Sequence, residues 1–155
     1  MPHYNTSTRQ RVADINLGLR VDKATATLPQ TTSSALFNVE VGRVLVNMIL
    51  GEVTTVIQTQ INATKLQSNP DTGTTTDMCA ALDITAKEVG SLFTISGTAG
   101  TALQAGSSGS VIGQATPVIV AAGAIELVCA ASNTGYVKWS IFYVPIDEGA
   151  YVEAA

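Results

Sequence analysis

The sequence predicts an all-β protein, a sandwich or jelly-roll-like barrel of about 8–10 short strands with an extended N-terminal arm. The first observation is a strictly alternating segment, in which one face of a strand collects Val137, Trp139, Ile141 and Tyr143. A period of two needs a pleated strand with one buried face. The second observation is the recurrence of runs rich in β-branched residues, separated by Gly, Pro and Asn turn signals. The 155 residues are the length of one domain.

Residues 1–23 are predicted to form the arm, and residues 24–155 the single β domain. Val12, Ile15 and Leu19 have roughly helical spacing, but Gly18 interrupts them, which favours an arm that becomes ordered on a partner. The arm contains four basic and two acidic residues, whereas the remainder contains four basic and ten acidic ones. This basic arm fits docking onto an acidic protein surface, and a solvated polar terminus fits the same charges. No concentrated basic face indicates a nucleic-acid partner.

Three strands are predicted in the first third of the β domain, over residues 24–28, 36–40 and 43–50. Pro29 ends the first strand, and Gly42 separates the second from the third. The third strand has apolar residues on both faces, with Val44, Val46 and Met48 on one side and Leu45 and Ile49 on the other. We therefore expect it to be covered on both sides.

The middle of the chain is more polar. Residues 52–66 are predicted to form one long strand because they are rich in Thr, Val and Ile, with a helix as the alternative. A turn is predicted over residues 68–73. Strands over 75–84 and 91–96 follow, joined by a single helical turn over 85–90.

The last third begins with a loop over residues 98–113, which is rich in Gly, Ser, Ala and Thr. Residues 117–121 and 125–130 are predicted to form a hairpin across residues 122–124. The turn Asn133-Thr134-Gly135 introduces the alternating strand, and Pro145 ends it. The tail over residues 147–155 closes the chain.

The composition is 46% hydrophobic and only 13% charged, with a mean hydropathy of +0.28. About a quarter of residues are charged in an ordinary domain, so much of the surface must be neutral and polar or must contact another protein. Residues 1–10 lack the apolar core of a signal peptide. The longest apolar stretch, over 118–131, is broken by Gly123 and Glu126 and is too short to span a membrane. We expect no membrane partner.

The sequence indicates no enzyme and no cofactor. His3 is the single histidine and lies in the arm, whereas Ser–His–Asp and Cys–His mechanisms need an imidazole held against the nucleophile. Cys79 and Cys129 are expected to be reduced, buried thiols, with a disulfide as the alternative. One histidine and two distant cysteines do not make a zinc site, which needs four N or S ligands.

Three further features of the sequence resemble functional sites. Asp77 and Asp83 would lie about 20 Å apart on one strand, which is too far for the two carboxylates of a glycosidase. Asp71 is expected to be a solvated turn residue, with calcium binding as the alternative. The glycine-rich loop over 97–109 lacks the Gly-Lys-Ser/Thr ending of a phosphate-binding loop. Trp139 is expected in the core rather than stacked on a sugar or base.

Several segments together resemble a family of small tailed-bacteriophage virion proteins over about four-fifths of the chain. The matching segments, read from the sequence, are Leu28-Pro29-Gln30-Thr31, Ala35-Leu36-Phe37-Asn38-Val39, Gly42-Arg43-Val44-Leu45-Val46, Ile49-Leu50-Gly51-Glu52-Val53-Thr54-Thr55, Gln58-Thr59-Gln60, Asp77-Met78-Cys79-Ala80, Ala130-Ala131-Ser132-Asn133-Thr134-Gly135, Val137-Lys138-Trp139 and Tyr143-Val144-Pro145-Ile146-Asp147-Glu148-Gly149-Ala150. The resemblance implies a β-rich accessory protein of the phage head, of the decoration or cement type.

As the resemblance implies, such a protein binds the major capsid protein on the outer capsid surface, as homotrimers at three-fold and quasi-three-fold positions. It would cross-link and stabilise capsomers, and would be made in the host cytoplasm. We hypothesise that Arg9, Arg11 and Arg20 of the arm dock onto capsid subunits. The alternatives are a tail or head-fibre/adaptor component, and a carbohydrate-binding adhesion module that would need an exposed Trp139 or Tyr136.

Overall fold

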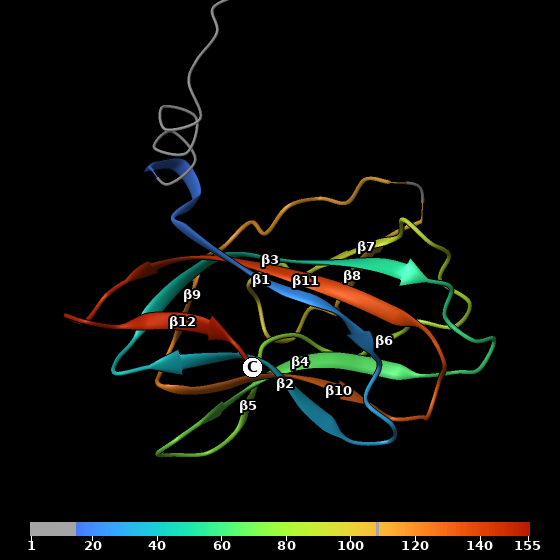
Figure 1. Cartoon of the computed structure of the whole chain (residues 1–155), viewed down its shortest axis with the longest axis horizontal. Helices are drawn as coiled ribbons and strands as arrows, with labels where there is room; N and C mark the ends of the chain where they lie inside the picture. Colours follow the sequence, from blue (N-terminus) through green and yellow to red (C-terminus); the bar gives the residue numbers. More distant parts are fainter. Residues whose placement is uncertain (1–14, 108) are drawn as a thin grey trace, which may run out of the picture.

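The computed structural model describes residues 15–107 and 109–155. Two antiparallel six-stranded sheets pack face to face (Figure 1), so the predicted all-β sandwich is confirmed. The described residues form twelve strands rather than the expected 8–10, because five of them contain only two or three residues. No helix in this part of the chain is long and apolar enough to cross a membrane.

The two sheets are built from strands that are far apart in sequence. The first sheet has the order β1 (Leu19–Thr27), β11 (Tyr136–Pro145), β3 (Val44–Thr55), β7 (Leu92–Thr94) and β8 (Gln104–Gly106), with β9 (Val118–Val120) also paired to β3. The second sheet has the order β12 (Tyr151–Ala154), β2 (Ser33–Glu40), β10 (Gly123–Cys129), β4 (Ala63–Pro70) and β5 (Thr76–Asp77), with β6 (Leu82–Asp83) also paired to β4.

The core lies between the sheets, and the inward face of β11 contributes four residues to it. Val137, Trp139, Ile141 and Tyr143 are all buried, as the alternation predicts. Trp139 is 3% exposed and stacks on Phe93 of β7, with 6.3 Å between the ring centroids. Burying these apolar faces away from water is the main force that holds the two sheets together.

The β domain begins before residue 24. Residues 19–23, which the sequence analysis places in the arm, belong to β1, and Leu19 pairs with Tyr143 of β11. Gly18 fixes the entry to this strand: it is buried with φ of 92°, and a Cβ on it would lie 2.2 Å from the carbonyl oxygen of Tyr143. A residue with a side chain could not pass β11 so closely.

A β-bulge changes which residues of β3 enter the core. Val44 and Val46 are buried, but the next buried residue is Ile49, because the register with β11 shifts between Phe142 and Tyr143. The bulge places Met48 on the outer face, opposite the side that strict alternation predicts. Leu45 and Met48 on that outer face are half-buried, so the strand is fully covered on the core side and only partly covered on the other.

Gln114 closes the gap that the bulge leaves along the edge of β3. β9 pairs with residues 44–46 and β7 with residues 50–52, which leaves residues 47–49 without a neighbouring strand on that side. The Gln114 side chain accepts a hydrogen bond from the Ile49 N–H (3.2 Å) and donates one to the Val46 carbonyl (3.0 Å). One amide side chain thus replaces two ladder bonds.

The long strand predicted over 52–66 does not form, and neither does the alternative helix. β3 ends at Thr55 and β4 begins at Ala63 in the other sheet, so the chain crosses between sheets within this segment. The predicted hairpin over 117–130 is wrong for the same reason, since β9 joins the first sheet and β10 the second. Local strand propensity does not report which sheet a strand joins.

Smaller differences concern the short strands. β4 continues through Pro70, so the turn begins at Asp71 rather than at residue 68. The predicted strand over 75–84 is divided into β5 and β6, residues 85–90 form turns without a helix, and β8 lies within the predicted loop over 98–113. The tail closes the fold as predicted, with β12 pairing with β2.

Candidate interaction surface

Of the three arginines expected to dock on a partner, Arg20 lies in the described part of the chain, and Arg9 and Arg11 lie outside it. Arg20 is on the outer face of β1, where its Nε donates a hydrogen bond to Asp22 Oδ1 (2.8 Å). Its guanidinium carbon lies 5.6 Å from the ring centroid of Phe142 on β11, close enough for a cation–π contact. Arg20 is therefore exposed but already has partners on its own sheet.

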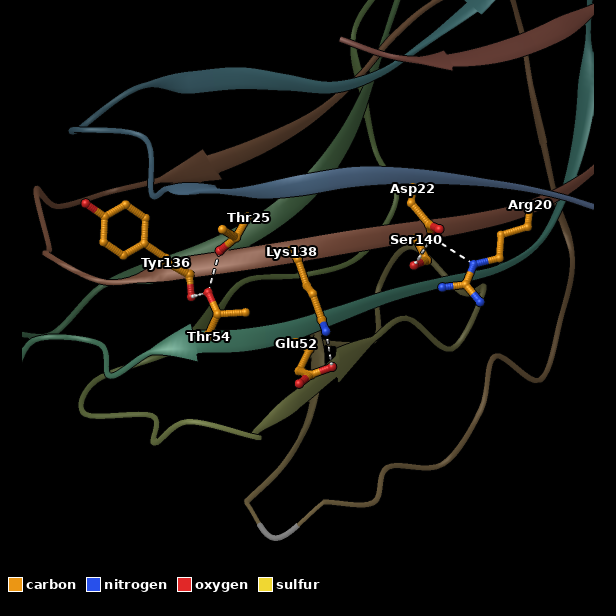
Figure 2. Close-up of polar contacts among 8 residues, drawn as sticks. All are labelled: Arg20, Asp22, Thr25, Glu52, Thr54, Tyr136, Lys138 and Ser140. Carbon is orange, nitrogen blue, oxygen red and sulfur yellow. Dashed lines mark hydrogen bonds and ion pairs between the residues drawn. The ribbon is translucent and has the colours of Figure 1, made fainter.

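Figure 2 shows that polar side chains on the outer face of β1, β11 and β3 pair across the strands. Ser140 donates a hydrogen bond to Asp22 Oδ1 (2.6 Å), and Lys138 forms an ion pair with Glu52 (3.1 Å). Ser140 first, and then Arg20, lower the pKa of Asp22 because their hydrogen bonds favour its charged form. The charges of these four side chains balance, since Arg20 is paired with Asp22 and Lys138 with Glu52.

The same face ends in a row of hydroxyl contacts. The Thr25 hydroxyl of β1 contacts the Thr54 hydroxyl of β3, and Thr54 donates a hydrogen bond to the Tyr136 carbonyl of β11 (3.3 Å). Bulky charged groups are absent from this row, and the three strands are tied together across their width.

A strained turn joins β2 to β3. The Gly42 N–H donates to the Glu40 carbonyl (2.8 Å), and Val41 between them has φ of 71°. A three-residue turn with a positive central φ is rare and strained, and for a β-branched residue this conformation is a genuine outlier. Val41 is nevertheless 71% exposed, so core packing does not explain the conformation.

Asp147 holds this turn in place. Its Oδ2 accepts hydrogen bonds from the Arg43 N–H (2.7 Å) and Nε (2.9 Å), and its Oδ1 accepts one from Nη2 (2.7 Å). These Arg43 hydrogen bonds hold the pKa of Asp147 well below its ordinary value. A Cβ on Gly42 would lie 2.7 Å from the Asp147 Cβ, so the turn and the carboxylate are in close contact. No local sequence pattern predicts this pair, although both residues lie in segments that carry the resemblance.

Two buried asparagines organise the opposite end of the sandwich. The Asn62 side chain accepts from the Ala131 N–H (3.1 Å) and donates to the Ala131 carbonyl (3.2 Å), which imitates a pair of strand residues. Asn133 donates from its side chain to the carbonyls of Gln58 and Gln60 (3.4 and 2.9 Å). Both asparagines are fully buried. The loop between β3 and β4 is therefore ordered by side-chain amides where a strand was predicted.

The described residues contain no cluster of three or more His, Cys, Asp or Glu side chains that could hold a metal ion. Asp77 forms an ion pair with Lys65 (2.7 Å), and Asp83 accepts hydrogen bonds from the N–H groups of Asn62 (2.9 Å) and Thr85 (3.0 Å). Hydrogen bonds from Thr85 and Asn62 lower the pKa of Asp83. Asp71 is exposed, as expected of a turn residue.

Cys79 and Cys129 are free and buried, as predicted. Cys79 accepts a hydrogen bond at sulfur from the Leu66 N–H (3.3 Å), and Cys129 lies 3.7 Å from the Thr64 hydroxyl. Burial raises the pKa of both thiols because it disfavours the thiolate. Both side chains pack in the core of the second sheet, where a thiolate nucleophile is not favoured.

Comparisons with known proteins give no name to this surface: no family model, no curated protein and no solved structure matches the chain.

Proposed function

We propose that this chain is a structural virion protein that binds the outer surface of a phage capsid, as trimers at three-fold and quasi-three-fold positions. There it binds the major capsid protein and cross-links neighbouring capsomers, which opposes the outward pressure of packaged DNA. Each contact of standard size buries about 1,600 Å². Repeating such contacts at each site gives tight multivalent binding without any reactive group. In this role the chain is no enzyme and uses no cofactor.

One observation supports the proposal above the others: residues of the resembling segments are paired with one another in space. Arg43 and Asp147, from two of these segments, form the ion pair that holds the strained turn. Gly51 lies under the ring of Trp139, and Asn133 donates a hydrogen bond to the Gln58 carbonyl. Segments that are distant in sequence thus contact one another in the fold, which is consistent with a structural role.

The alternatives have less support. For the carbohydrate-binding module, the buried Trp139 counts against the alternative, whereas the exposed Tyr136 still meets its condition. A tail or head-fibre component would share the same stiffness. Its copy number per particle would be small, so counting copies separates it from a lattice protein.

The arm hypothesis is tested by truncation. Because Leu19 and Arg20 belong to β1, the suitable deletion removes residues 1–14 and leaves the sandwich intact. We expect the truncated protein to fold and to bind capsids far more weakly than the full chain. Charge reversal of Arg9 and Arg11 to Glu should weaken binding in the same direction, whereas Arg20→Gln should have a smaller effect because Arg20 is paired with Asp22. Undiminished capsid occupancy after truncation would reject the arm hypothesis.

A further inference from the structure

The first sheet has an open edge beside β9. Among the described strands, β9 pairs with β3 alone, over residues 44–46 of that strand. β7 and β8 continue the sheet only beside residues 50–52 of β3. The side of β9 that faces away from β3 therefore has no neighbouring strand in the described part of the chain. Such an edge presents peptide groups to which another strand can bind.

The peptide group that this edge presents is that of Ile119. The Val46 carbonyl accepts a hydrogen bond from Gln114, which lies on the side of β3 where β9 pairs. Successive strand residues direct their peptide groups to opposite sides, so Val46 and its partner Val118 face each other. Ile119 is the next residue, and its N–H and C=O therefore point away from β3. No residue that the structure describes forms a hydrogen bond with either group.

A cleft between the two sheets opens beside the same edge. Its volume is about 230 Å³, whereas pockets for drug-sized ligands have about 300–1,000 Å³, so the cleft suits side chains better than a small molecule. Asp77 lines it but is already paired with Lys65. Most of the remaining lining is apolar or small, and comes from both sheets and from the loop after β7: Ser68, Thr76, Met78, Ala99, Val118 and Val120.

β9 also lacks the charges that usually protect a sheet edge. Natural proteins place charged side chains on edge strands because these oppose pairing with another chain. β1, at the opposite edge of the first sheet, has Arg20, Asp22 and Lys23. Residues 117–125 contain no charged side chain, and Ile119 is 63% exposed. The sequence of β9 therefore permits the pairing that the sequence of β1 opposes.

We infer that β9 is a docking edge for an extended segment of another protein, which adds a strand to the first sheet. In strand addition, main-chain hydrogen bonds give affinity and pockets for alternate side chains give specificity. Cross-strand partners share a face of the sheet, so the residue opposite Ile119 lies on the outer face, where Ile119 is paired with Leu45. Its two neighbours point into the cleft. The segment therefore has three consecutive apolar residues at its centre.

A second copy of this chain does not supply that segment. Runs of three or more large apolar residues occur in the sequence at 44–46, 48–50, 118–120 and 141–144. All but 118–120 belong to β3 and β11, which lie inside the first sheet. The β9 strand of a second copy would keep Val120 buried in its own core and could not fill the cleft. The occupant is therefore a different protein, and the inference does not rest on the proposed function.

A displayed library of random decapeptides, selected on the immobilised protein, tests the inference. We expect the enriched peptides to contain three consecutive apolar residues and to protect the Ile119 amide from hydrogen exchange. Ile119→Pro removes the outward N–H and leaves the bonds to β3 intact, as proline permits at a sheet edge. It should weaken peptide binding about tenfold, the equivalent of one hydrogen bond. Ala99→Trp should also weaken binding, because its ring occupies the cleft.

Two matched variants serve as controls, and the Tm of every variant is measured to show that it folds. Ile119→Thr keeps the outward N–H, so it should weaken binding less than Ile119→Pro does. Thr101→Trp places the same large ring on an exposed residue of the same loop that does not line the cleft. We expect it to bind the enriched peptides as wild type does.

Three results would overturn the inference. The first is a selection that enriches no peptide, or only peptides without an apolar run. The second is equal binding of the enriched peptides to wild type and to folded Ile119→Pro. The third is a free wild-type oligomer that Ile119→Pro dissociates in light-scattering measurements, because a second copy of this chain would then occupy the edge.

Discussion

The indole ring of Trp139 occupies the space of the side chain that Gly51 lacks. The two residues are paired across β11 and β3, and a Cβ on Gly51 would lie 2.8 Å from Trp139 Cζ3. Phe93 of β7 pairs with Gly51 on its other side and stacks on Trp139. An aromatic ring that covers a strand glycine compensates for the missing side chain. Trp139, Gly51 and Phe93 form a row across β11, β3 and β7, the three middle strands of the first sheet.

Gly51→Ala should therefore destabilise the protein. The added methyl group must push the indole away, and overpacking of a core typically costs about 1–3 kcal/mol, which exceeds the gain of up to about 1 kcal/mol from replacing a strand glycine. Urea unfolding followed by the emission of the single tryptophan would measure the change. Gly100→Ala is the control, because a Cβ there meets nothing within 4 Å. A Gly51→Ala variant as stable as wild type would show that the ring does not need this space.

Asn62→Ala should loosen the loop between β3 and β4. The substitution leaves the partly buried N–H and carbonyl of Ala131 without their side-chain partners, and each unsatisfied buried group costs about 1–3 kcal/mol. We expect a loss of about 2–4 kcal/mol in unfolding free energy and faster hydrogen exchange at the Ala131 amide. Gln60→Ala in the same loop changes an exposed side chain and should be close to neutral. Equal effects of the two substitutions would contradict the role given to Asn62.

The Arg43–Asp147 ion pair predicts a specific dependence of stability on pH. Because the pKa of Asp147 is lower in the folded than in the unfolded protein, the pair stabilises the fold at pH values above the ordinary aspartate pKa of about 3.9. Asp147→Asn should lower the Tm by a constant amount from pH 7 to pH 5. The difference should shrink as the pH falls below 4, where the unfolded carboxylate becomes protonated. A difference that grows on acidification would have the wrong sign for this account.

Cys79 and Cys129 should be unreactive in the native protein. Their burial raises the thiol pKa and blocks reagents, so modification by a thiol reagent at pH 8 should proceed only through unfolding. Two thiols should react at once in concentrated denaturant, and the native rate should rise with urea. Rapid modification of one thiol without denaturant would place that cysteine at the surface.

Several strands and turns of the sandwich were predictable from the sequence because they depend on local patterns. The alternation from Val137 to Tyr143 and the break at Gly42 are signals that a strand and a turn produce by themselves. The bulge in β3 was not predictable, since it depends on how β11 pairs with it and on Gln114 more than sixty residues away. Residues 52–66 have strand composition, yet the buried amides of Asn62 and Asn133 provide the hydrogen bonds that a strand would have made.

The candidate surface was less predictable than the fold. Arg20 was identified by its charge, but charge does not reveal that Asp22 and Phe142 already contact it. The strained Val41 turn depends on Asp147, which lies 104 residues from Arg43 in sequence. Only the folded chain brings these groups together, because no local pattern links the two segments.

The central claim is that this protein is a component of the capsid lattice, and cryo-electron microscopy of purified virions tests it most directly. The account predicts hundreds of copies, arranged as trimers on the outer surface. A few copies at one vertex or on the tail would contradict the lattice role, and absence from the particle would contradict the virion assignment altogether.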